Sequence, residues 1–92
     1  MTTEISGPRL RSLLRQADRV AENGKRAAAV QLYKEILEEA PETEAAWIGL
    51  ANVEPNQTEK ERALQRALAI KPDSVAAKKG LAKLWGEALP EV

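Results

Sequence analysis

The 92-residue chain contains no cysteine and no histidine, and these two absences exclude several classes of function. Without them there is no disulfide, no thiol nucleophile, no imidazole base and no zinc or haem site built on such ligands. Long apolar runs are also missing, whereas a transmembrane helix needs roughly 20 apolar residues, and no charged-then-apolar leader opens the chain. We therefore expect a soluble, cytoplasmic protein with no cofactor and no membrane partner, for which most enzyme chemistry is excluded.

The sequence also lacks an excess of charge of either sign. Fourteen Lys and Arg residues balance 14 Asp and Glu residues, and the basic residues are spread evenly along the chain. Nucleic acids and anionic membranes are bound by concentrated basic surfaces, so we expect neither as a partner. Prolines and glycines number only five each, and a content of 43% apolar and 30% charged residues is typical of one globular domain.

Alanine and leucine dominate the apolar residues that are present. The chain has 16 Ala and 11 Leu but only nine Val and Ile, which favours helix over strand. Alanine buries little apolar area, and burial stabilises by about 25 cal/mol per Å², so such helices must pack at close range. Small residues are therefore predicted to be the points of close contact between helices: Ala17, Gly49, Ala51, Gly80 and Ala82.

Apolar residues recur at intervals of three and four in five segments, which predicts five antiparallel helices joined by short turns. After a polar arm over residues 1–8, the predicted helices cover about 9–22, 25–39, 44–52, 57–71 and 74–89. Gly24 is expected to end the first helix in the left-handed conformation. Because proline disfavours helical geometry in the residue before it, three prolines are expected to stop helices: Pro41, Pro72 and Pro90.

Side-chain caps are predicted before the last three helices. Ser, Thr, Asp and Asn accept hydrogen bonds from the free backbone amides of a first helical turn. The candidates are Thr43, then Asn56 or Thr58, then Asp73 and Ser74.

An internal repeat relates two parts of the chain. Residues 32–51 align with residues 63–82 at an offset of 31, with seven of 20 positions identical. The identities follow an order of helix, proline turn and second helix with a small-residue face. This order is typical of stacked helical repeats.

These residues resemble the tetratricopeptide repeat, or TPR, whose pattern is W-x2-L-G-x2-Y, then A-x3-F, then P, over about 34 residues. Trp47-x2-Leu50-Ala51 is similar to the first helix of that pattern, and Ala29-x3-Tyr33 followed by Pro41 is similar to the second. The departures are Leu13 and Lys78 at tryptophan positions, Lys60 at an alanine position, and a second unit three residues short at 54–56. The resemblance implies antiparallel helix-turn-helix repeats stacked as a short α-α superhelix. It divides one domain, 9–89, into a repeat at about 10–41, a truncated repeat at about 44–72 and a capping helix at about 74–89.

The resemblance also implies a concave groove, lined by the first helix of each pair, that holds an extended peptide or a partner helix. By position, its residues here are Arg11, Leu14, Arg15, Asp18, Ile48, Asn52, Lys79 and Lys83. Leu14 and Ile48 lie off the main apolar stripes of their helices. Either they pack against each other, or they form an apolar strip flanked by basic residues and suited to a peptide with hydrophobic and acidic side chains. The family's clamp for a peptide carboxylate is not expected, because Leu14 and Gly49 stand where it has polar residues.

Three chemical alternatives are weaker. Ser74 and Lys78 are at the spacing of a Ser-Lys nucleophile pair, although a helix cap explains Ser74 better. Trp47 and Trp85 are potential stacking platforms for bases, but both lie on apolar stripes that favour core packing. A cluster of acidic residues is more typical of a solvated turn than of a cation site: Glu38, Glu39, Glu42 and Glu44.

The sequence therefore predicts a non-catalytic protein-protein interaction module or scaffold that binds a protein or peptide of unspecified identity. The alternative is structural self-association. The last predicted helix has a second apolar stripe that includes Ala82, Trp85 and Leu89, and a weak homodimer through Trp85 and Leu89 would cover it.

Overall fold

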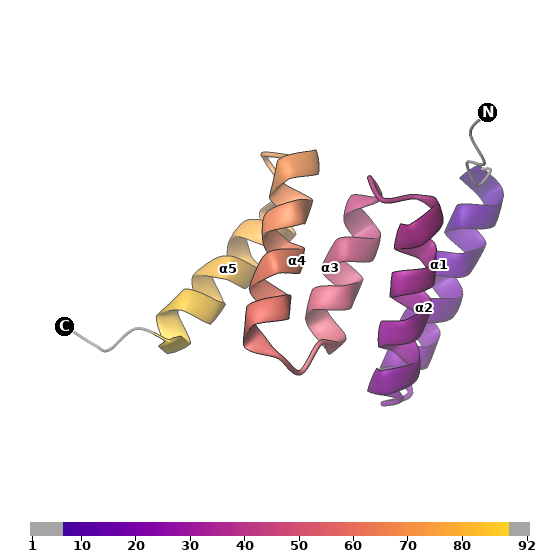
Figure 1. The fold of residues 1–92 in the computed structure, drawn as a ribbon, viewed down its shortest axis with the longest axis horizontal. Helices are drawn as coiled ribbons and strands as arrows, with labels where there is room; N and C mark the ends of the chain where they lie inside the picture. The colour runs from indigo at the N-terminus through magenta and orange to yellow at the C-terminus, as the bar shows by residue number, and fades with distance from the viewer. Residues whose placement is uncertain (1–6, 89–92) are drawn as a thin grey trace.

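The computed structural model describes residues 7–88, which form five α-helices and the turns between them (Figure 1). The helices are α1 (Gly7–Glu22), α2 (Arg26–Glu39), α3 (Glu44–Val53), α4 (Gln57–Ile70) and α5 (Val75–Ala88). No strand occurs between residues 7 and 88, so the predicted all-α, five-helix class is confirmed. The helix limits lie within two residues of the expected ones. The main correction is at the start of α1, which includes Gly7 and Pro8 of the expected polar arm.

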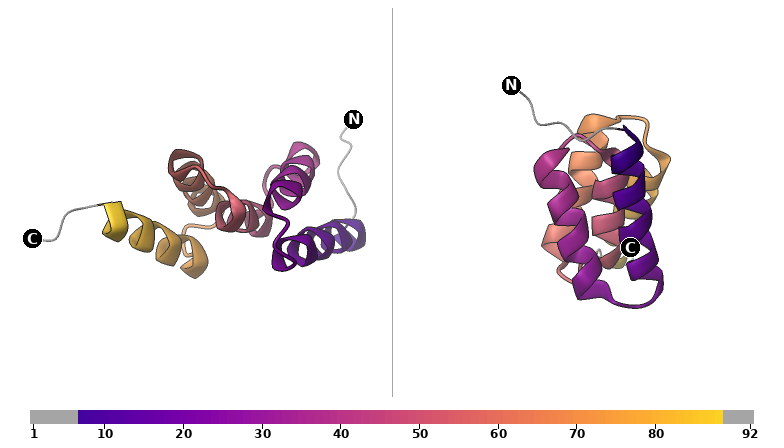
Figure 2. Two further views of the ribbon diagram at one scale, coloured as in Figure 1. Left: turned by 90° about the horizontal axis from the view of Figure 1, so that it is seen from below. Right: turned by 90° about the vertical axis from the view of Figure 1, so that its right-hand side faces the viewer.

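The helices stack side by side in chain order, each antiparallel to the next (Figure 1). The helices α1, α3 and α5 lie in one layer, and α2 and α4 lie in the other (Figure 2). Each helix packs on its neighbours in the chain, and α1 also packs against α3. The result is an elongated stack with extents of 51 × 29 × 18 Å.

Gly24 makes the turn between α1 and α2 possible. Its φ of +82° is in the left-handed region that side chains with a Cβ rarely adopt. The Gly24 amide donates to the Ala21 carbonyl at 3.0 Å, and the Lys25 amide donates to the Val20 carbonyl at 3.2 Å. This pair of bonds is a Schellman motif, which satisfies the last carbonyls of α1 as expected.

The predicted caps have different outcomes. The Asn56 side chain accepts a hydrogen bond from the Glu59 amide at 3.0 Å, and the Ser74 hydroxyl accepts one from the Ala77 amide at 3.2 Å. Thr43 precedes α3 as expected, but its side chain makes no capping bond, so that part of the prediction is wrong. Its carbonyl accepts from Ala46 and Trp47 instead, because that carbonyl begins the helical bond series.

A continuous core runs through the interfaces of α1 to α4 and continues onto α5. Its buried members are alanines and branched aliphatic residues, with one aromatic residue, Tyr33: Ala17, Ala29, Tyr33, Ile36, Leu37, Ala46, Leu50, Ala51, Val53, Ala63, Leu64 and Leu81. Ala82 is exposed, so its predicted role as a contact point is wrong. The reason is that α5 packs on α4 through the face that carries Ala77, Leu81 and Leu84.

Two glycines let helices approach closely. A Cβ on Gly49 would lie 2.4 Å from the Tyr33 ring, and a Cβ on Gly80 would lie 2.9 Å from a methyl of Leu64. Real Cβ contacts are essentially never shorter than 3.0 Å. Gly49 therefore allows α2 to pack closely against α3, and Gly80 allows α4 to pack closely against α5, as the small-residue pattern predicts.

Candidate functional site

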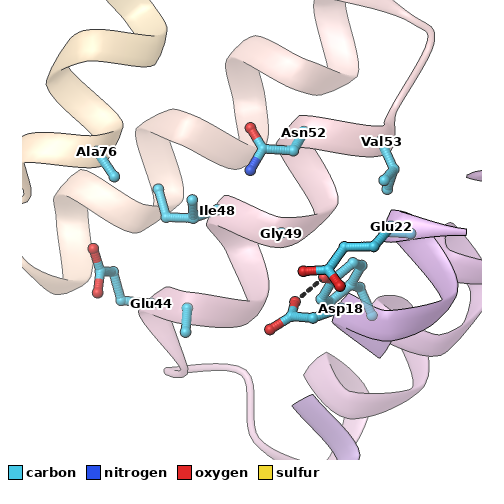
Figure 3. Close-up of a pocket in the computed structure, with 11 residues that line it drawn as sticks. Asp18, Glu22, Glu44, Ile48, Gly49, Asn52, Val53 and Ala76 are labelled. Carbon is cyan, nitrogen blue, oxygen red and sulfur yellow. Dashed lines mark hydrogen bonds between the residues drawn. The ribbon is translucent and has the colours of Figure 1, made fainter. Parts of the chain in front are cut away.

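The layer of α1, α3 and α5 carries a hollow of about 430 Å³, drawn in Figure 3. One wall is the C-terminal half of α1, with Asp18 and Glu22. The floor is α3, where Ile48 and Asn52 succeed each other by one helical turn, and Ala76 of α5 stands on the far side. We call this space the acidic hollow, because its charged lining residues are all carboxylates: Asp18, Glu22 and Glu44.

Asp18 is held in place by the buried ring beneath the acidic hollow. The Tyr33 hydroxyl donates a hydrogen bond to the Asp18 carboxylate (Figure 3). Burial raises the pKa of Tyr33 well above its usual range, and the bond to Asp18 and the negative charges of Asp18 and Glu22 raise it further. Tyr33 therefore stays a neutral donor, and the full negative charge of Asp18 remains at the surface of the hollow.

Glu44, which lines the acidic hollow, connects α3 to α5. Its carboxylate accepts a hydrogen bond of 2.5 Å from the Ser74 hydroxyl, which itself caps α5. Ser74 is buried, with 1% of its surface exposed. A side chain at the start of α3 thus fixes the start of α5, 30 residues away in the chain.

A second hollow of about 380 Å³ adjoins the first. It shares Ile48, Asn52 and Ala76 with the acidic hollow and extends between α3, α4 and α5 over Gly80 and Leu84. We call it the basic hollow, because its charged lining residues are all cationic: Arg26, Lys60 and Lys83. Two spaces of opposite charge therefore meet on one face of α3.

The eight predicted groove residues fall into three groups. Asp18, Ile48, Asn52 and Lys83 line the two hollows. Leu14 is half-buried and packs against the core, without lining either hollow. The remaining three are exposed and line neither hollow: Arg11, Arg15 and Lys79.

The hollows differ in charge from the flanks that the sequence predicts. Arg11 and Arg15 were expected to flank the groove on the first helix, whereas the part of α1 that lines the acidic hollow presents Asp18 and Glu22. The helix α3 is shorter than α1, 10 residues against 16, and the hollow includes only the C-terminal half of α1. Glu22 was missed, although its spacing of four residues from Asp18 placed both on one face of a helix. Arg26 and Lys60 were missed because they come from the other layer.

The alternative chemical sites also have definite places. Ser74 is buried and hydrogen-bonded to Glu44, while Lys78 is exposed. Among the side chains of residues 7–86 no cluster of three metal-ligating groups occurs. None of the described helices is long and apolar enough to cross a membrane. Glu44 of the predicted acidic cluster faces Ser74 instead.

The two tryptophans are less buried than the apolar stripes predict. Trp47 packs against the core but stays half-buried; its indole nitrogen donates to the Pro41 carbonyl at 2.8 Å, and the Arg66 guanidinium lies 5.5 Å from the ring centroid. Trp85 is 45% exposed, so the core assignment is wrong for this residue. Its predicted partner in self-association, Leu89, lies outside the described residues.

The chemistry of the two hollows is inferred from their own side chains, because comparison of the chain with protein-family models, curated proteins and solved structures found no match. The arrangement offers shape, an apolar centre and fixed charge. These are the features by which a protein holds a peptide segment.

Proposed function

We propose that the protein is a non-catalytic interaction module of the TPR type, which binds an extended peptide or a partner helix across α1, α3 and α5. The observation that carries the proposal is the position of Ile48 and Asn52. Both residues line two adjoining hollows on one face of the stack, and Ile48 is a half-buried apolar residue between the carboxylates of one hollow and the cations of the other. An apolar side chain between two polar rims is the usual composition of a peptide-binding surface.

The order of the elements supports the TPR type. Successive helices alternate between two layers (Figure 2), glycines lie at close helix contacts, and the repeated segments 32–51 and 63–82 each contain a proline turn. Within such a stack the helices of one layer present side chains from several repeats on one face. The proposal places the ligand on that face.

A phage-displayed library of random dodecapeptides tests the proposed function. The variant Asn52→Trp places a large side chain in both hollows without altering the core, since Asn52 is exposed. We expect the parent to enrich peptides that Asn52→Trp no longer binds. Gln16→Trp is the matched control, because Gln16 is exposed on α1 and lines neither hollow. Equal binding by Asn52→Trp and the parent would contradict the proposal.

A second candidate function is self-association through α5, which the exposure of Trp85 favours. Val75 on the same helix is 63% exposed, so α5 carries two large apolar residues at the surface. Sedimentation over a concentration series tests this candidate. We expect the mass to rise toward that of a dimer at high micromolar concentration for the parent and to stay monomeric for Trp85→Ala. A monomeric parent over the whole series would exclude the α5 dimer.

A further inference from the structure

The charges around the groove are sorted by sign and by position. Two carboxylates of the acidic hollow, Asp18 and Glu22, come from α1, whereas two cations of the basic hollow, Lys60 and Lys83, come from α4 and α5. The two spaces are continuous because Ile48, Asn52 and Ala76 belong to both. A ligand that lies across α3 therefore meets negative charge, then an apolar side chain, then positive charge.

These charges are not neutralised inside the described part of the chain. Glu22, Lys60 and Lys83 form no ion pair with any side chain from residues 7–86. The partners of Asp18 and Glu44 are the neutral hydroxyls of Tyr33 and Ser74, which leave both negative charges in place. The acidic hollow therefore presents negative charge to a ligand, and the basic hollow presents positive charge.

We propose that the groove selects a peptide segment whose side chains reverse in charge along its length. A basic side chain lies in the acidic hollow, an apolar side chain lies on Ile48, and an acidic side chain lies in the basic hollow. This inference rests on the proposed function and specifies its ligand. A uniformly acidic peptide is repelled by Asp18 and Glu22, and a uniformly basic peptide by Lys60 and Lys83, so charge order becomes the source of specificity.

The inference predicts what the dodecapeptide library selects. We expect enriched peptides to carry a basic and an acidic residue on opposite sides of an apolar residue. Because the charges are at the rim, their effect is moderate: an exposed pair changes affinity about two- to fivefold, and reversing one charge about five- to tenfold. Raising the salt from about 0.1 M to about 1 M shortens the Debye length from about 10 Å to about 3 Å and should weaken this preference.

Charge reversal assigns each end of the peptide to its hollow. Glu22→Lys should weaken the selected peptides about five- to tenfold, and affinity should return when the basic residue of the peptide is changed to Glu. Lys83→Glu should be rescued only by changing the acidic residue of the peptide to Lys. The matched controls are Glu38→Lys and Lys78→Glu, which change the same charges at exposed positions outside both hollows and should bind like the parent.

The outcomes separate the inference from the proposed function. If Asn52→Trp blocks binding but the selected peptides show no charge order, the inference is wrong and the proposed function stands. The same holds if the affinity lost in Glu22→Lys or Lys83→Glu is not restored by the matching change in the peptide. If the parent enriches no peptide, or if Asn52→Trp binds the selected peptides as well as the parent does, both the inference and the proposed function are wrong. The free protein could instead form a dimer through the groove. If Glu22→Lys and Lys83→Glu each dissociate that dimer and a mixture of the two variants restores it, the groove is occupied by a second copy of the chain and not by a peptide.

Discussion

The first three helices and the last helix are attached by different means. Between α2 and α3, the rigid Tyr33 ring fits against the bare backbone of Gly49, and the hydroxyl of that ring bonds to α1 through Asp18. Between α4 and α5, the contact at Gly80 is made by the flexible end of Leu64. The start of α5 is fixed by Ser74 and Glu44, but the face that carries Trp85 is exposed.

This difference indicates where the groove is rigid and where it yields. The acidic hollow is built on an interlocked set of three helices, whereas one wall of the basic hollow is α5, which packs mainly on a single neighbour, α4. Local opening follows the number of buried contacts, so α5 should open at a lower free energy than α2 or α3. Each of the following predictions tests one side of this contrast.

Gly49→Ala should have the largest effect. The new Cβ would lie 2.4 Å from a ring that is 2% exposed and tethered by Asp18, so the ring cannot move aside. We expect a loss of about 3 kcal/mol in the free energy of unfolding, because overpacking of a filled core costs that much. For a domain of this size, the midpoint of thermal unfolding should fall by roughly 15 °C in circular dichroism.

Gly80→Ala is the matched control for that variant. Its Cβ meets a leucine methyl at 2.9 Å, and the leucine can rotate. The higher helix propensity of alanine, about 1 kcal/mol, offsets much of the strain, so we expect a change below about 1 kcal/mol. Equal losses for the two variants would remove the contrast between a rigid and a yielding interface.

Tyr33 should make the interlocked region sensitive to alkaline pH. The pKa of this hydroxyl is raised on folding, so the folded state holds the proton after the unfolded state has lost it. This contribution is complete below the unfolded pKa of about 10 and is lost as the pH rises above it. Tyr33 is the only tyrosine in the chain, so tyrosinate absorbance reports it alone.

We expect tyrosinate to appear only at the pH at which helical circular dichroism is lost. Tyr33→Phe separates this effect from the titration of lysines, because it should retain more of its neutral-pH stability above pH of about 10 than the parent does. Tyrosinate formed reversibly near its ordinary pKa in a fully helical protein would show that Tyr33 is accessible and not interlocked.

Ser74→Ala tests the attachment of α5. The change removes the cap of α5 and leaves the Glu44 carboxylate without its hydroxyl partner. We expect a loss of about 2 kcal/mol in urea unfolding, at the upper end for a helix cap. Asn56→Ala removes only an exposed cap on α4 and should cost about 1 kcal/mol. A loss at Ser74 no larger than at Asn56 would mean that the bond to Glu44 adds nothing.

The sequence is informative about local features and less so about how helices are rotated. Gly24, Pro41 and Pro72 follow helix ends that backbone geometry alone predicts, whereas Pro90 lies outside the described residues. Asn56 and Ser74 act within one turn of their own helix. The bond from Ser74 to Glu44 spans 30 residues and leaves no local pattern. For the groove, residues spaced by four in the sequence are known to share one face of a helix. The spacing does not show how the helix is rotated about its axis, so it does not show whether that face lines the groove.

On α5 the prediction and the hollow agree in part. Lys83 lines the basic hollow as expected of a groove residue, whereas Lys79 does not and its neighbour Gly80 does. Successive residues of a helix point about 100° apart, so a small rotation of the helix decides between such neighbours. Burial of the tryptophans was overestimated for a related reason. An apolar stripe shows which face can be covered, but the neighbouring helices decide how much of Trp47 or Trp85 is covered.

Gly86→Ala should have the smallest effect, with the opposite sign. An added Cβ at Gly86 meets no described atom within 4 Å, and the backbone there is helical without a positive φ. Replacing the glycine restricts the unfolded chain, which should raise the free energy of unfolding by about 0.5 kcal/mol near a helix end. Because α5 is attached loosely, we expect the gain mainly as slower hydrogen exchange of α5 amides, with those of α2 and α3 unchanged. Equal slowing in all helices would mean that α5 opens only with the rest of the stack, and the contrast between the two regions would be wrong.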